Sequence, residues 1–256
     1  MSDPRALYYS EPELRDPVAI VGFPSVGIVG SIFAGLATRE LGLPVVAGIT
    51  APDIPPYAFI TGGRPVPQIR VAAGRPKVRR KPKSGEEGEK PAKRVKPNDF
   101  VVVTSEFAPK PEQSYDIADC ILDVLEHLRV SQVVCLEGVA GPGSTDPILG
   151  VAGSDAAQEM LESAGIQILA DGIVRGLSGS ILLEGSYRRM DTMALLVPAN
   201  PQIPDPRAAA RLAEPLGRMF PRLSIDTAPL YAEAEEIDNH IQAQQENPGS
   251  GGGIYG

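Results

Sequence analysis

The residues best suited to chemistry lie in a glycine-rich segment near the middle of the chain. Gly138-Val-Ala-Gly-Pro-Gly-Ser-Thr-Asp146 follows an apolar run and carries two hydroxyls and a carboxylate. Open α/β sheets bind ligands beyond the carboxyl ends of their strands, so we expect a small-molecule pocket here. The residues expected to form it are Gly138, Gly141, Gly143, Ser144, Thr145 and Asp146.

Hydrolytic or metal-dependent catalysis finds little support in the sequence. A nucleophilic serine needs a histidine base, and the chain offers His127 and His240. His127 lies late in an amphipathic segment, where a histidine is more often solvated or matched to the helix dipole. The sequence contains no GxSxG elbow and no HxxxH, HExxH or Cys/His cluster. We therefore expect no catalytic residue, no metal and no cofactor.

A second glycine-rich segment, Gly22-Phe-Pro-Ser-Val-Gly-Ile-Val-Gly30, joins an expected strand to an expected helix. Helix N-terminal amides at such a turn could hold a phosphate or another anion. The spacing fits neither GxGxxG nor a P-loop, which needs Lys-Ser/Thr where Ile28-Val29 stand. We expect instead that these glycines allow a tight turn and close packing of the helix on the strand.

The last residues of the chain form its sharpest motif. The stretch Asn247-Pro-Gly-Ser-Gly-Gly-Gly253 has the composition of a flexible linker and leads to Ile254-Tyr255-Gly256. These three residues combine an apolar side chain, a penultimate tyrosine and a carboxylate. A frayed terminus is the simple alternative. A polar linker gains no solubility from ending in Ile-Tyr, however, so the arrangement indicates a docking motif.

Apolar runs alternate with amphipathic segments along most of the chain, which predicts strands alternating with helices. This order favours an α/β fold with an open, mostly parallel sheet flanked by helices, and its first three elements form a βαβ unit. The expected strands are 17–23, 44–50, 68–72, 100–104, 132–136, 166–174 and 193–197. The expected helices are 25–41, 117–128 and 154–164, with a helix or turn at 178–187.

From Pro204 the pattern becomes purely helical. Asp205-Pro206 is typical of an N-cap followed by a proline at the first helical position, and a second, amphipathic helix is expected from Asp226. The two helices should end near Phe220 and Gln245. The expected domains are an α/β core at 1–203, a helical hairpin packed on it at 204–246, and a flexible tail at 247–256.

Composition indicates the cellular location in which the protein functions. The chain has 256 residues, of which 43% are hydrophobic, so it can bury a large core without disulfide bonds or structural metal ions. Cys120 and Cys135 show no ligand spacing and suit a reducing interior, which favours a cytoplasmic location. No apolar run reaches the ~18 residues that would span a bilayer, so we expect no membrane partner.

Charge is distributed unevenly along the chain. Residues 75–97 hold 10 Lys and Arg against 3 Glu, a local +7, so from a net charge of −8 the remainder carries −15. This basic stretch has almost no apolar residue and is expected to be a disordered loop. A basic arm for nucleic acid or an acidic protein is the alternative, but the acidic remainder should repel nucleic acid, so we expect none as a partner.

Three segments give the chain a family resemblance. They are Gly22–Gly30 after the first strand, Pro204-Asp-Pro-Arg-Ala-Ala209, and Asp226-Thr-Ala-Pro-Leu230 leading to Ala234-Glu-Glu-Ile237. In this order they resemble the archaeal members of the proteasome assembly chaperone 2 family over most of the chain. The basic stretch 75–97 departs from the usual pattern of that family.

The resemblance implies a nucleoside-phosphorylase-like α/β core and a homo-oligomer. It also implies an HbYX motif (hydrophobic residue, tyrosine, any residue), which docks between α-subunits of the proteasome core particle; Ile254, Tyr255 and Gly256 match it. The implied function is that of a non-enzymatic assembly chaperone or ATP-independent activator whose partner is the core-particle α-ring. A nucleoside-phosphorylase-like hydrolase or transferase, or a small-molecule-binding protein, using the loop from Gly138 to Asp146 is the alternative.

Overall fold

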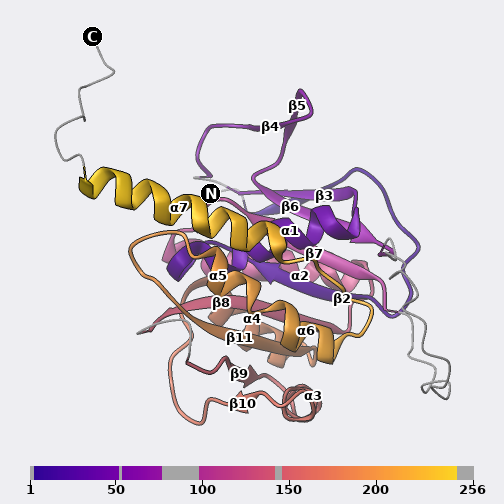
Figure 1. The fold of residues 1–256 in the computed structure, drawn as a ribbon. Helices are drawn as coiled ribbons and strands as arrows, with labels where there is room; N and C mark the ends of the chain where they lie inside the picture. The colour runs from indigo at the N-terminus through magenta and orange to yellow at the C-terminus, as the bar shows by residue number, and fades with distance from the viewer. Residues whose placement is uncertain (1–2, 52–53, 77–97, 142–145, 247–256) are drawn as a thin grey trace, which may run out of the picture.

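The computed structural model describes residues 3–51, 54–76, 98–141 and 146–246 (Figure 1). Within these ranges the strands are β1 (Arg5–Tyr8), β2 (Val18–Gly22), β3 (Val45–Thr50), β4 (Phe59–Thr61), β5 (Arg64–Val66), β6 (Ile69–Gly74), β7 (Phe100–Ser105), β8 (Gln132–Ala140), β9 (Leu149–Ala152), β10 (Gln167–Ile168) and β11 (Asp191–Ala199). The α-helices are α1 (Val29–Leu41), α2 (Ser114–His127), α3 (Asp155–Ser163), α4 (Gly176–Tyr187), α5 (Pro206–Ala210), α6 (Ala213–Met219) and α7 (Ala228–Glu246). Short 3-10 turns, η1 (Val26–Ile28) and η2 (Pro111–Gln113), precede α1 and α2.

Nine strands form one open sheet in the order β1-β3-β6-β7-β2-β8-β11-β9-β10. The central strands β7, β2, β8 and β11 are parallel, which confirms the expected α/β fold. The sheet is more mixed than expected, because among the described strands its parallel and antiparallel pairings are four each. The first βαβ unit does run parallel, but β6 and β7 lie between β2 and β3.

Helices cover both faces of the sheet (Figure 1). On one face, side chains such as Phe33 of α1, Leu161 of α3 and Leu230 of α7 share one apolar core. On the other face, α2 and α4 supply Ile121 and Ile181 to a second core. The central strands are buried on both faces, which is why their sequences are continuously apolar rather than alternating.

The helix expected from Asp205 to about Phe220 is in fact two helices, α5 and α6. In a continuous helix Pro215 would offer no N–H to the carbonyl of Arg211, and its ring would crowd that carbonyl. The chain therefore breaks between Ala210 and Ala213. The expected N-cap is confirmed, because the Asp205 carboxylate accepts a hydrogen bond from the Ala208 N–H at 2.9 Å.

Other expectations need correction. The strand expected at 166–174 is reduced to β10, and the edge strand β1, the strand β9 and the hairpin of β4 and β5 were not expected. That hairpin projects from the body of the molecule (Figure 1). Its base is held by the Gln68 amide, which donates to the Pro55 carbonyl at 2.6 Å. Most of the basic stretch, residues 77–97, lies outside the described residues.

Candidate functional site at the strand ends and on α7

The carboxyl end of β2 lies beside Leu136 of β8 in the middle of the sheet, and β8 continues past it to Ala140. From β2 the chain leads through α1 to β3 on one side, whereas β8 is followed by β9 and β10 at the opposite edge. Divergence of this kind marks the topological switch point, outside which open α/β sheets bind ligands. The turn after β2 and the C-terminal part of β8 therefore form a candidate ligand site.

Close packing fixes the turn after β2. A Cβ atom on Gly22 would collide with the carbonyl oxygen of Gly30, and a Cβ atom on Gly30 would collide with the carbonyl oxygen of Leu136. Gly27 and Ile28 have φ angles of 62° and 47°. The left-handed region is strained for a β-branched residue such as Ile28. The glycines thus serve the tight turn and close packing expected from the sequence.

A polar cluster lies beside this turn. The Ser25 hydroxyl accepts a hydrogen bond from the Gly138 N–H at 2.9 Å, and so ties the turn to the end of β8. On the face covered by α4, the Ser178 hydroxyl donates to Glu137 Oε2 at 2.6 Å. A carboxyl group and two hydroxyls from three separate segments therefore meet at the end of one strand.

The electrostatics of this cluster are unusual. Burial raises the pKa of Glu137 to about 7, although hydrogen bonds from the Ser178 and Ser25 hydroxyls favour its charged form. A carboxyl group of this pKa exchanges its proton near neutral pH and can act as either donor or acceptor. The sequence motifs did not mark Glu137, Ser25 or Ser178 as site residues. The signal available was an acidic residue within the otherwise apolar run of β8.

Of the pocket residues expected from the sequence, the structure describes Gly138, Gly141 and Asp146, and a Cβ atom added to Gly141 would lie 3.8 Å from Asp146 Oδ2. Gly138 packs against the backbone of Val26, whereas Gly141 lines a cavity of about 400 Å³ between residues 200–207 and α7. The main-chain carbonyl of Asp146 accepts a hydrogen bond from the Arg211 guanidinium. Gly143, Ser144 and Thr145 lie outside the described residues.

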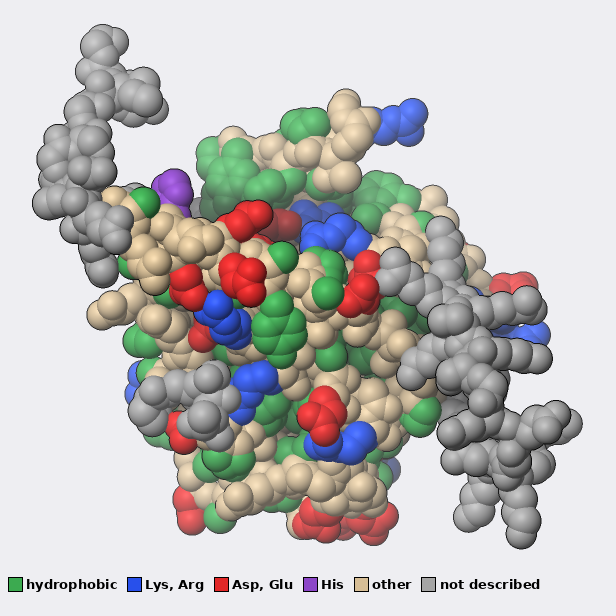
Figure 2. Space-filling view, viewed as in Figure 1, with side chains coloured by type: hydrophobic (Ala, Val, Ile, Leu, Met, Phe, Trp, Pro, Cys, Tyr) green, Lys and Arg blue, Asp and Glu red, His purple; other side chains and the backbone are tan. Residues whose placement is uncertain are grey.

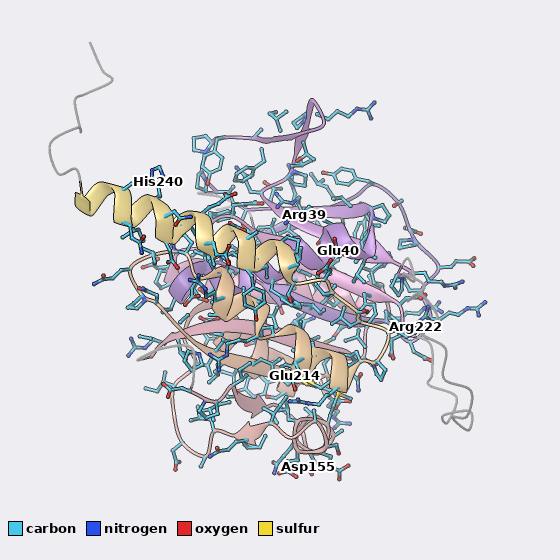
Figure 3. All side chains as sticks on the ribbon, viewed as in Figure 1. Arg39, Glu40, Asp155, Glu214, Arg222 and His240 are labelled. Carbon is cyan, nitrogen blue, oxygen red and sulfur yellow. The ribbon has the colours of Figure 1, made fainter. Side chains whose placement is uncertain are left out.

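Neither histidine lies in the polar cluster. His127 ends α2, at the edge of the sheet where the parallel strands begin, and its ring centroid lies 4.8 Å from that of Tyr8. His240 is exposed on the outer half of α7 (Figure 3). Within the described ranges, no group of three or more acidic, histidine or cysteine side chains could hold a metal ion.

Helix α7 is anchored at one end only. Leu230 and Ala234, in its first two turns, are 1% and 3% exposed, and Asp238 forms an ion pair with Arg207 at 2.7 Å. Beyond Ala234, no side chain up to Ala243 is fully buried. The C-terminal half of the helix extends past the body of the molecule (Figure 1). None of the described helices has the length and hydropathy needed to cross a membrane.

Comparison with known proteins shows which family has this architecture. The sequence model of the PAC2 family matches residues 19–245. The chain belongs to the PAC2 family. That family accounts for the sheet, both helical layers and the helices after Pro204, because the match extends almost to the end of α7.

Several proteins similar to this PAC2 protein come from archaea. Protein MJ0106 of Methanocaldococcus jannaschii, described as uncharacterised, is 26% identical over 230 residues, which are 90% of this chain and 86% of the relative. The crystal structure of Pyrococcus furiosus PbaA, an archaeal homologue of proteasome-assembly chaperone, is 28% identical with a TM-score of 0.75 over 95% of this chain and 96% of that chain. Pyrococcus furiosus PbaB, an archaeal proteasome activator, shares the fold with a TM-score of 0.74 at 19% identity, over 96% and 100% of the two chains.

Proposed function

We propose that this protein binds the proteasome core particle, as an assembly chaperone or an ATP-independent activator, and docks Ile254-Tyr255-Gly256 into pockets between the α-subunits. The observation that carries the proposal is the family match over residues 19–245, together with the likeness to PbaA, a homologue of proteasome-assembly chaperone. The terminal triplet supplies the apolar residue, tyrosine and carboxylate that such docking requires.

The form of α7 supports presentation of a docking motif. From Ala234 to Glu246 the helix extends by about 18 Å at 1.5 Å per residue. A linker of seven residues, 247–253, with an r.m.s. span of roughly 15 Å, then separates α7 from Ile254. The C-terminal half of α7 and the linker together would allow the terminal triplet to contact a surface away from the body of the protein. The linker would also accommodate a mismatch in symmetry between two rings.

Binding by a single triplet should be weak. Burial of Ile254 and Tyr255 contributes roughly 2–3 kcal/mol each, and a charge-assisted hydrogen bond to the carboxylate about 1.5–3 kcal/mol. Ordering three residues costs about 1–2 kcal/mol apiece, and association costs roughly 4 kcal/mol or more. Several triplets on one oligomer would gain avidity of roughly 10²–10⁴, so the mechanism calls for a homo-oligomer.

The projecting hairpin favours self-association. Tyr57 and Ile60 are 48% and 64% exposed there, and hydrophobic side chains are visible on this projection in Figure 2. An isolated two-stranded hairpin is marginally stable in water, so a second copy would stabilise it. Ile60→Asp should lower the mass measured by light scattering. Thr61→Asp, on the opposite face of β4, should leave it unchanged; an unchanged mass for Ile60→Asp would remove this surface from the proposal.

Pull-down of purified core particles tests the docking proposal. The intact chain should retain core particles, whereas Tyr255→Ala and a chain lacking 254–256 should lose them without any change in oligomeric mass. Tyr187→Ala, at a tyrosine 69% exposed on α4, is the matched control and should bind normally. Retention by the truncated chain would contradict the proposal. A peptidase assay on the retained particles then separates an activator, which raises peptide hydrolysis, from a chaperone.

A second candidate function is small-molecule binding at the end of β8. The cluster of Glu137, Ser25 and Ser178 at the switch point favours it. In a thermal-shift screen, nucleosides should then stabilise the native protein, and Glu137→Gln should abolish this response to nucleosides. Silence across the screen would remove this candidate.

A further inference from the structure

A second cavity lies beneath the start of α7, away from the Glu137 cluster. Its volume is about 570 Å³, within the range of small-molecule sites. Four parts of the chain form its walls: residues 147–148, residues 165–167, the stretch from the end of α5 through α6, and the start of α7 with the preceding Thr227. The cavity thus combines an apolar wall with polar side chains from two other elements.

Arg211 contributes a positive charge to the cavity. Its guanidinium lines the cavity and donates to the main-chain carbonyl of Asp146. Its Nη1 atom is buried without a hydrogen-bond partner, and no carboxylate among the described residues lies within 4.0 Å of this guanidinium. The Arg211 side chain as a whole is partly buried, but a buried N–H group without a hydrogen-bond partner is costly in free energy. An oxyanion bound in the cavity would offer this N–H group an acceptor and the guanidinium a counter-charge.

A second arginine lines the same cavity. The Arg218 Nε atom donates to the Ala164 carbonyl at 2.7 Å, which holds the side chain in place. Its Nη1 atom pairs at 2.6 Å with Glu214, a residue of α6 that also lines the cavity and whose carboxylate is 80% exposed (Figure 3). An exposed pair of this kind is weak and leaves the arginine available to a ligand. Two arginines against one solvated acid make the cavity positive in a chain of net charge −8.

We propose that this cavity binds the oxyanion group of a small molecule, a phosphate or a carboxylate, between Arg211 and Arg218. The planar guanidinium group forms bidentate hydrogen bonds with both kinds of oxyanion. The hydroxyls of Thr227 and Tyr231, at the start of α7, line the same cavity and can donate to the remaining oxygens. The site is separate from the proposed docking motif and does not depend on it.

Titration of the full chain with inorganic phosphate, and separately with acetate, tests the proposal by calorimetry and thermal unfolding. Sodium chloride at matched ionic strength is the reference. At least one of the two anions should stabilise the protein beyond the chloride reference. A response to phosphate alone identifies a phosphate ligand, and a response to acetate alone identifies a carboxylate.

Arginine variants locate the response. Arg218→Gln should weaken binding about tenfold or more, as expected from the loss of a charge-assisted hydrogen bond. Arg211→Gln should do the same, and if it fails to fold, Arg218→Gln carries the test alone. Arg39→Gln, on an exposed position of α1, is the control with the same change in charge and should bind normally. Glu137→Gln should also bind normally, which separates this cavity from the cluster on β8. No response to either anion, or a response that survives Arg218→Gln, would overturn the proposal.

Discussion

Replacing Glu137 by glutamine should remove a pH dependence of folding stability that originates at the end of β8. Burial moves the pKa of this carboxyl from 4.5 to about 7 in the folded protein. Between these values the folded state keeps a proton that the unfolded chain has released. Stability therefore decreases as pH rises from about 4.5 to about 7, and then levels off.

The magnitude follows from the pKa change. At about 1.4 kcal/mol per pH unit, Glu137 should reduce the free energy of unfolding by roughly 3 kcal/mol between the two limits. Glutamine does not titrate, and its carbonyl can still accept the hydrogen bond from Ser178. The variant should therefore gain roughly 3 kcal/mol relative to the native protein as the pH is raised.

Urea denaturation at several pH values between about 4.5 and 8 measures this effect. The quantity of interest is the difference between the native protein and Glu137→Gln, because contributions from other groups cancel in it. Glu159→Gln, at an exposed position of α3, should show a flat difference. Ser178→Ala should move the midpoint to higher pH, since it removes a hydrogen bond that favours the charged form. A difference for Glu137→Gln that is independent of pH would refute the reasoning.

Further variants test the packing that supports this site. Gly30→Ala should destabilise the protein by roughly 1–3 kcal/mol in denaturant titrations, because its methyl group would collide with the Leu136 carbonyl. Gly35→Ala, in the same helix but with only the flexible end of Arg39 near the added carbon, should instead stabilise by about 0.5–1 kcal/mol; equal effects of the two substitutions would contradict the packing described. Leu230→Ala should cost about 2–5 kcal/mol and increase hydrogen exchange throughout α7, and exchange confined to the last turns would show that α7 is anchored elsewhere.

The sequence predicted the central elements because their signals are local. Apolar runs such as 100–104 and 132–136 are buried on both faces, and the Asp205 N-cap depends on contacts within one turn. The sheet order could not be predicted in the same way. Nothing local to β3 indicates that β6 and β7 lie between it and β2. The edge strand β1, with its mostly exposed side chains, carries no pattern that marks a buried strand.

The same distinction between local and long-range signals applies to the candidate sites. The polar loop at 138–146 was identified from its composition, and among its described residues Gly141 lies close to the Asp146 carboxylate, whereas Gly138 packs against the backbone of Val26. The Glu137 cluster joins residues far apart in the sequence, since Ser178 is 41 positions from Glu137. Only the sheet and α4 bring them together, so spacing in the sequence held no sign of them. The terminal triplet remains a prediction from sequence, because residues 247–256 lie outside the described ranges.

A density map of this protein bound to the proteasome core particle is the most direct test of the central claim. The account predicts that Ile254 and Tyr255 occupy pockets between neighbouring α-subunits, with the Gly256 carboxylate paired to a basic side chain. Contacts made by other surfaces, with the terminal triplet in solvent, would contradict it.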